Sequence, residues 1–272
     1  MQIFKQIKAS NTLSWEPREN DFWMHTHDDY EIYCFLFGDA KYAVEGSIYS
    51  LKPGDLILMR RSEAHHLLLQ SSAPYRRMTV NFTPPAEENG VFSSKMMIPF
   101  VNRPLGRHNR YPAAVFGDFH WQYYLEKICD AKEERSRSIY LAALLEELSD
   151  QFGKMCSCEE EQVADQSADI IGYINRHLTE PLSLERISER FYLSKSQLNR
   201  KFKQANGSTV WEYITAKRLL MAKELLEHGG RPTEIYQQCG FGDYATFYRA
   251  YRRQFGITPK NDRVLTWKPA NH

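Results

Sequence analysis

The stretch LERISERFYLSKSQLNRKFKQANGSTVWEYI, residues 184–214, recurs about 48 residues later as PTEIYQQCGFGDYATFYRAYRRQFGITPKNDR, residues 232–263. Matched positions keep their character in both copies, apolar against apolar and glycine against glycine. The pairs are Ile187 with Ile235, Leu193 with Phe241, Leu198 with Phe247, Phe202 with Tyr251, and Gly207 with Gly256. Each copy reads as a short helix, a tight turn and a longer helix, which is the helix-turn-helix layout. The repeat therefore predicts two helix-turn-helix units in an all-helical C-terminal region.

The two longer helices each carry a polar face beside their buried stripe. The first is predicted to begin after Ser194, because Gln197 stands three residues later in a capping-box pattern. A single polar face is most often simply solvated. Two copies in register, each with an arginine at the equivalent place, instead favour DNA contact, since arginine bonds the guanine edge bidentately. The faces consist of Ser196, Asn199, Arg200 and Lys203 in the first copy and Ala245, Tyr248, Arg249 and Arg252 in the second, with Tyr244 near the helix start.

The connector between the copies supports the same interpretation. Residues Thr209 to Gly229 predict one helix of about 20 residues, roughly 30 Å long. This length is close to the ~34 Å between successive major grooves on one face of DNA. The distribution of charge agrees with this interpretation. The number of Lys and Arg residues minus the number of Asp and Glu residues gives a net charge of −6 for residues 1–167 and +7 for residues 168–272. A basic C-terminal region favours a polyanionic partner.

Residues 168–263 resemble the DNA-binding domain of the AraC family of bacterial transcription regulators. The resemblance rests on SLERISERFYLSKSQLNRKFK (183–203), GSTVWEYITAKR (207–218) and GFGDYATFYRAYRRQFGITP (240–259). In that family both long helices enter the major groove of double-stranded promoter DNA, and an activator also contacts RNA polymerase. The resemblance implies base contacts from Ser196, Asn199 and Arg200, then from Tyr244, Ala245 and Arg249; Lys203 and Arg252 complete the predicted DNA-binding set.

The first half of the chain has a different pattern. EIYCFLFG (31–38) alternates in hydrophobicity, AKYAVEGSIYSL (40–51) holds a Gly-Ser turn, and KPGD (52–55) precedes LILM. Short antiparallel strands at this spacing predict a sandwich or small barrel. Residues 118–150 change to helical periodicity and predict a helical hairpin. We therefore expect an α+β protein with a β-barrel and hairpin at 1–152, a linker at 153–167 and the helical domain at 168–272.

HTHDDYE (25–31) and His65, which follows a PGD turn and a strand, together resemble the cupin barrel. We expect His25, His27 and Glu31 on one strand face, with Tyr33 at the same parity. In cupin enzymes such positions bind a divalent metal, which implies His25, His27, Glu31 and His65 as the ligand set here. The alternatives are a catalytic metal, a metal without turnover, hydrogen bonds to a small effector, and a purely structural role.

The attached DNA-binding region favours the effector among these alternatives. The sensor half of AraC-type regulators resembles a cupin and often keeps HxHxxxE without using it for catalysis. The resemblance therefore implies a sensor for a small molecule, with a carbohydrate as the expected class and no resident cofactor. Trp23, Tyr33 and Tyr42 are candidate aromatic platforms for a sugar, although buried aromatic residues more often belong to the core. The competing class is a cupin metalloenzyme with an appended DNA-binding domain.

One apolar stripe suggests self-association. Leu141, Leu144, Leu145 and Leu148 share one face of the second hairpin helix. Such a stripe can pair with its own copy across a two-fold axis, which predicts a homodimer. The alternative is that it packs on the barrel of its own chain.

Several classes of protein find no support in the sequence. There is no P-loop, GxGxxG after a strand, GxSxG or HExxH motif. No apolar run approaches the ~18 residues of a membrane span, and the start lacks the apolar core of a secretory signal. The five cysteines are odd in number and scattered, which favours a reducing, cytoplasmic location.

Overall fold

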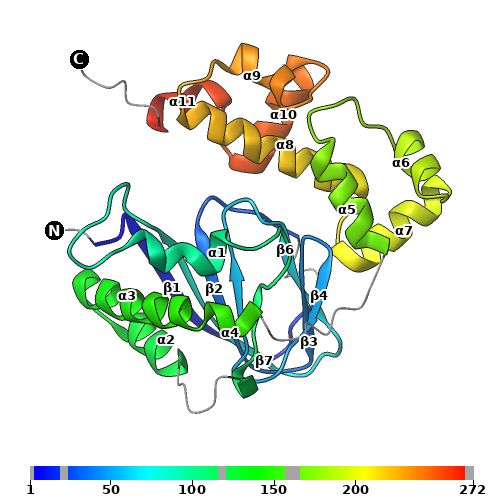
Figure 1. The fold of residues 1–272 in the computed structure, drawn as a ribbon. Helices are drawn as coiled ribbons and strands as arrows, with labels where there is room; N and C mark the ends of the chain where they lie inside the picture. The colour runs from blue at the N-terminus through cyan, green and yellow to red at the C-terminus, as the bar shows by residue number, and fades with distance from the viewer. Residues whose placement is uncertain (1–2, 19–23, 116–120, 157–165, 267–272) are drawn as a thin grey trace. The chain divides into compact units, whose positions relative to one another are not determined.

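The computed structural model describes residues 3–18, 24–115, 121–156 and 166–266. The chain divides into two compact units, residues 1–23 with 27–163 and residues 164–272 with 24–26 (Figure 1). Both ends of the predicted linker 153–167 are helical. Helix α4, Phe152–Cys156, buries Met155 in the N-terminal core, and α5 already begins at Gln166. The residues between these helices lie outside the described part of the chain.

The N-terminal unit contains two antiparallel sheets. The larger has the strand order β1-β7-β2-β5-β8 and the smaller β4-β3-β6. The strands are β1 Gln6–Ser14, β2 Tyr30–Phe37, β3 Ala40–Val44, β4 Ser47–Ser50, β5 Leu56–Met59, β6 His65–Leu69, β7 Tyr75–Thr83 and β8 Arg110–Tyr111. The fold is cupin-like as predicted, but the two sheets do not close into one hydrogen-bonded barrel.

Alternation along β2 creates two separate cores. Ile32 and Cys34 enter the core beneath the helices, whereas Tyr33 and Phe35 enter the core between the two sheets. Successive strand side chains point to opposite faces, so one strand serves both layers. Glu31 has the parity of Tyr33, and the exposed fraction of Glu31 is only 5%. The strand therefore directs one carboxylate toward the interior between the sheets.

The predicted helical hairpin is present and covers the outer face of the larger sheet (Figure 1). It comprises α2, Trp121–Asp130, and α3, Glu134–Asp150. The smaller helices of this unit are η2 Ser94–Met97, α1 Ile98–Val101 and η3 Ala113–Val115.

The leucine stripe of α3 was predicted to form a dimer interface, and that assignment is wrong. Leu141, Leu144, Leu145 and Leu148 are all 0% exposed within their own chain. They pack in the core between the hairpin and the larger sheet. Side chains with no surface left cannot meet a partner, so the stripe serves the intrachain alternative.

The C-terminal unit is helical throughout its described residues. Its helices are α5 Gln166–Arg176, α6 Leu184–Arg190, α7 Lys195–Asn206, α8 Val210–Glu227, α9 Pro232–Gln238, α10 Tyr244–Phe255 and α11 Pro259–Thr266. The pairs α6–α7 and α9–α10 are the two predicted helix-turn-helix units, and α8 is the predicted connector. None of the helices within the described residues is long and apolar enough to cross a membrane.

The repeat in the sequence corresponds to a repeat in local structure. Ser194 and Gln197 form the predicted capping box at the start of α7, and Asp243 caps α10 by accepting a hydrogen bond from the Thr246 amide. Gly207 ends α7 with φ 67° and Gly256 ends α10 with φ 71°. Both glycines adopt the left-handed conformation that side chains disfavour, which explains why glycine stands at the same place in each copy.

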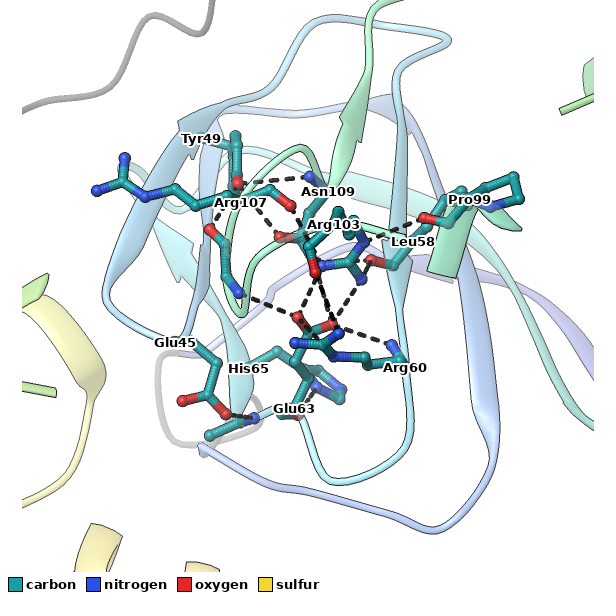
Figure 2. A network of polar contacts seen from close by, with 12 residues as sticks. Glu45, Tyr49, Leu58, Arg60, Glu63, His65, Pro99, Arg103, Arg107 and Asn109 are labelled. Atoms are coloured by element: carbon teal, nitrogen blue, oxygen red, sulfur yellow. Dashed lines mark hydrogen bonds and ion pairs between the residues drawn. The ribbon is translucent and has the colours of Figure 1, made fainter. Parts of the chain in front are cut away.

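A buried ion pair holds the loop that leads into β6. Glu63 and Arg103 are both 0% exposed at their side chains, and Arg103 donates Nη1–H and Nη2–H to the two carboxylate oxygens at 2.7 Å each. Three further donors complete the carboxylate, namely the Arg60 amide at 3.0 Å, the Gly106 amide at 3.0 Å and Asn109 Nδ2 at 3.2 Å (Figure 2). Burial alone disfavours the charged carboxylate, but the bonds and charge of Arg103 outweigh it and lower the pKa of Glu63.

We expect Leu144→Ala to lower the unfolding free energy of the N-terminal unit by about 2–5 kcal/mol, because it leaves a cavity in a filled core. Val101→Ala is the control, since Val101 lies in the same unit with 46% exposure. Urea unfolding followed by tryptophan fluorescence measures both variants. If Leu144→Ala were as mild as the control, the burial of the stripe would be wrong.

We expect Glu63→Gln to cost about 3–5 kcal/mol at neutral pH, because it leaves the Arg103 charge buried without its partner. The double variant Glu63→Leu with Arg103→Met should cost less than the single one, since it removes both charges. In the native chain the lowered pKa means that this stabilisation is full above the unfolded value of 4.5 and is lost as pH falls through the folded value. Unfolding curves from neutral to acid pH test this, and a stability difference between the native chain and the Glu63→Gln variant that did not change with pH would contradict it.

Candidate functional site

Two histidines and one glutamate meet inside the N-terminal unit. His27 Nε2 lies 2.7 Å from Glu31 Oε2, and His65 Nε2 lies 3.5 Å from the same oxygen. Asn81 Nδ2 donates to that oxygen at 3.1 Å. With His25 added, the four ligand atoms all lie within 4.8 Å of one another. The structure therefore brings together the four residues that the cupin resemblance implied.

Backbone carbonyls determine that Nδ1 carries a hydrogen in both His27 and His65. His27 Nδ1 lies 2.9 Å from the Asp29 carbonyl, and His65 Nδ1 lies 2.7 Å from the Glu63 carbonyl. A carbonyl oxygen only accepts, so Nδ1 carries the hydrogen in each ring. Nε2 of each ring is thereby left to face Glu31. This is the arrangement in which imidazole nitrogens serve as metal ligands, or as donors when protonated.

A shared proton explains the short contact between His27 and Glu31. Two acceptors would repel at 2.7 Å, so one partner must carry a hydrogen between them. Burial lowers the pKa of His27, but the hydrogen bond and charge of Glu31 outweigh it and leave that pKa raised. Burial likewise favours the neutral acid at Glu31, yet His27 and His65 hold its pKa well below the ordinary value. Both shifts favour the imidazolium and carboxylate forms of the pair, and a cation could take the place of the proton.

The cluster has one open side. The His65 side chain is fully buried, and its ring stacks on Tyr42 with 6.1 Å between centroids. The His27 side chain is 23% exposed, and His25 is exposed. A small molecule or ion arriving from solvent would meet His25 and His27 first, with Glu31 behind them.

The structure differs from the sequence prediction in two respects. His25 and His27 precede β2 instead of lying on one strand face with Glu31. Tyr33 and Tyr42 are only 2% and 3% exposed and pack against each other, so they act as core rather than as open platforms for a sugar. Trp23 lies outside the described residues.

The sequence alone did not indicate Asn81 as part of the cluster. It lies on β7 directly opposite Glu31 on β2. Nothing in the sequence indicates which residue of a distant strand will pair with Glu31, because pairing depends on register.

The predicted DNA-binding residues lie at the surface of α7 and α10, with two exceptions. Ser196, Arg200, Lys203, Ala245, Arg249 and Arg252 are exposed or partly exposed. Asn199 is half-buried, and its Oδ1 accepts the Val210 amide at 3.3 Å, which ties α7 to the start of α8. Tyr244 is also half-buried, with its ring centroid 5.8 Å from that of Tyr236. Both residues thus have a structural contact that the sequence did not indicate.

Both halves of the chain match models of known protein families. A family model for an AraC-like ligand binding domain matches residues 9–185, and one for a helix-turn-helix domain matches residues 187–263. The HTH-type transcriptional activator RhaS of Escherichia fergusonii is 27% identical over 270 residues, covering 93% of this chain and 92% of that protein. RhaS of Klebsiella pneumoniae is 25% identical with the same coverage.

Among solved structures, the DNA-binding domain of the global transcriptional factor AdpA, in complex with a target DNA, is 28% identical. It covers 38% of this chain and 93% of its own, with a TM-score of 0.36. The family models and the RhaS activators match almost the whole chain, and their printed descriptions give no support to a metalloenzyme. Since the ligand-binding match alone spans more than half of the sequence, the chain belongs to the AraC family of transcription regulators and is not an enzyme.

Proposed function

We propose that this regulator reads its promoter through α7 and α10 and that a small polar effector, a carbohydrate, acts on it through the cluster of His25, His27, Glu31 and His65. The observation that carries the DNA-reading role is the repeated surface arginine, Arg200 on α7 and Arg249 on α10. Surface arginines at equivalent places of two helix-turn-helix units are suited to reading guanine in two major-groove segments.

The proposal for the effector rests on the chemistry of the cluster. A sugar presents hydroxyl groups that both donate and accept hydrogen bonds. The Glu31 carboxylate accepts, Asn81 donates, and the His27 imidazolium donates, so the cluster offers both kinds of partner. The open side at His25 and His27 gives such a molecule access, while the buried His65 fixes the back of the site.

A divalent metal is the second candidate for the same cluster. The donor set fits it, because three imidazoles and one carboxylate suit first-row transition metals and two of the rings already donate Nδ1–H to carbonyls. His25, His27, Glu31 and His65 would hold the ion. It would supply a Lewis-acidic anchor for an oxygen of the effector, with no turnover.

Three further features belong to the proposal. The regulator acts in the cytoplasm, where promoter DNA is found, and it contacts RNA polymerase if it activates transcription.

A homodimer would double the DNA contacts without any new base contact. Since the α3 leucines are buried, the hairpin offers the exposed Tyr123 and Ile139 as apolar side chains for such a contact. Sedimentation of Tyr123→Glu with Ile139→Glu tests this, and an unchanged dimer would exclude the hairpin face.

We expect Arg200→Ala and Arg249→Ala each to weaken specific DNA binding by about 1–3 kcal/mol and to relax base preference at one position. Arg231→Ala, which removes an exposed arginine paired with Glu234, is the matched control and should leave specificity unchanged. Binding is measured on an operator selected from random DNA by the purified protein. Unaltered base preference in both variants would remove these arginines from the reading role.

We expect His27→Ala to abolish the thermal shift that the cognate ligand gives while leaving operator binding intact. The probes are a panel of monosaccharides and, separately, Zn²⁺, Ni²⁺ and Mn²⁺, each with and without EDTA. A thermal shift with a sugar that persists in EDTA supports direct contact between the effector and the cluster. A sugar shift that appears only when a metal is present supports the metal anchor. A sugar response that survives His27→Ala would place the effector elsewhere.

A further inference from the structure

A cleft of about 780 Å³ lies within the C-terminal unit, beside the second helix-turn-helix unit. One wall is the first part of α8 with Trp211, Thr215 and Arg218, and another wall is a face of α10. The loop after α5 and the turn before α10 also line it. The residues from α10 are Thr246, Arg249, Ala250 and Arg253.

The lining carries positive charge and no acidic side chain. Three arginines contribute to it, but Arg218 is buried and donates to the Leu178 and Glu180 carbonyls at 2.8 Å each. Arg249 and Arg253 stand one helical turn apart and are exposed. Neither guanidinium makes a hydrogen bond or a close ion pair with another described residue, but the charge of Arg249 helps to lower the pKa of Asp243 and that of Arg253 helps to lower the pKa of Glu212. The available charge of the cleft therefore lies along its α10 wall and suits an anion.

Trp211 lines the same cleft as these arginines and has no evident structural need to be large. It is the second residue of α8 and is 49% exposed, whereas its neighbour Val210 is fully buried. The indole N–H is a donor only, so it suits a phosphate oxygen. An aromatic donor and two arginines lining one cleft are a combination that a sugar-phosphate backbone would satisfy.

The position of the cleft relative to the reading face indicates which anion fits. The predicted reading face of α10 contains Ala245, Tyr248, Arg249 and Arg252, and the cleft face shares Arg249 with it. The two faces are adjacent on the helix, rotated by about 100°. With the reading face in a major groove, the cleft face turns toward the backbone that borders that groove on the α8 side.

We infer that the cleft seats the DNA phosphate backbone between the two major-groove segments, with Arg253 and Trp211 as phosphate-contacting residues. This rests on the proposed reading role of α10. Such contacts fix the register of the two helix-turn-helix units on the operator and carry no base information. Arg249 then serves as the boundary residue, with a base on one side and the backbone on the other.

The first test measures operator affinity of the full chain as a function of salt concentration. Arg253→Ala should lower the magnitude of the slope of log affinity against log salt by about 0.9 for each bound protomer, the value of one lost phosphate contact, with base preference unchanged. Trp211→Phe should weaken all sequences alike and leave the slope unchanged, because it removes a neutral donor. Arg231→Ala, outside the cleft, serves as the control for loss of surface charge and should change the slope less. A slope equal to that of the unaltered protein in Arg253→Ala would overturn the inference.

The second test locates the contact by ethylation interference. At least one phosphate between the two base-contacted segments should block binding of the unaltered protein when ethylated and should lose that effect in Arg253→Ala. An identical ethylation-interference pattern in both proteins would overturn the inference. The inference would fail even if inorganic phosphate inhibited operator binding and Arg253→Ala abolished that inhibition, because the unchanged pattern would show that Arg253 contacts no DNA phosphate. If the unaltered protein selected no operator at all, the DNA-reading proposal itself would fail, which is a separate outcome.

Discussion

The buried pair of Glu63 and Arg103 is the interaction on which the sensory half of this protein depends. Two opposite charges without solvent contact are tolerated only because five donors satisfy the carboxylate (Figure 2). Those donors come from the β5–β6 loop and from residues 103–109, so the pair joins two distant segments. Gly106 adopts φ +68°, and an added Cβ would lie 2.7 Å from Glu45 Cβ. The Glu63 carbonyl then orients His65, which links a structural ion pair to the candidate effector site.

The DNA-binding half is organised by repetition instead of by one buried pair. Each unit packs a short and a long helix together beside α8, and each long helix ends at a left-handed glycine. Local differences between the copies show how the chain adapts the motif. Gly240, with φ +82°, makes the turn in the second unit, whereas Tyr192 takes φ 55° at the matched place in the first. Tyr251 also donates to the buried carboxylate of Asp262 at 2.6 Å, which secures α11 against the second unit.

Features encoded by neighbouring residues could be predicted, and features that depend on distant pairing could not. The capping box at Ser194, the connector helix and the strand over residues 31–37 follow from spacing and periodicity, and the structure confirms them. The resemblance to cupins implied the histidine cluster, but the partnership of Asn81 with Glu31 required strand register. The leucine stripe of α3 shows the limit most clearly. Its periodicity indicates a face to be buried, but only the tertiary structure shows that its own chain covers it.

Methylation interference on a selected operator shows directly whether one chain reads two major-groove segments with α7 and α10. Guanine N7 lies in the major groove, so its methylation blocks an arginine contact. We expect two clusters of interfering guanines for each bound protomer, about 10 base pairs or one helical turn apart. One cluster should disappear in Arg200→Ala and the other in Arg249→Ala. A single cluster per protomer, or loss of the same cluster in both variants, would show that α7 and α10 do not read separate segments.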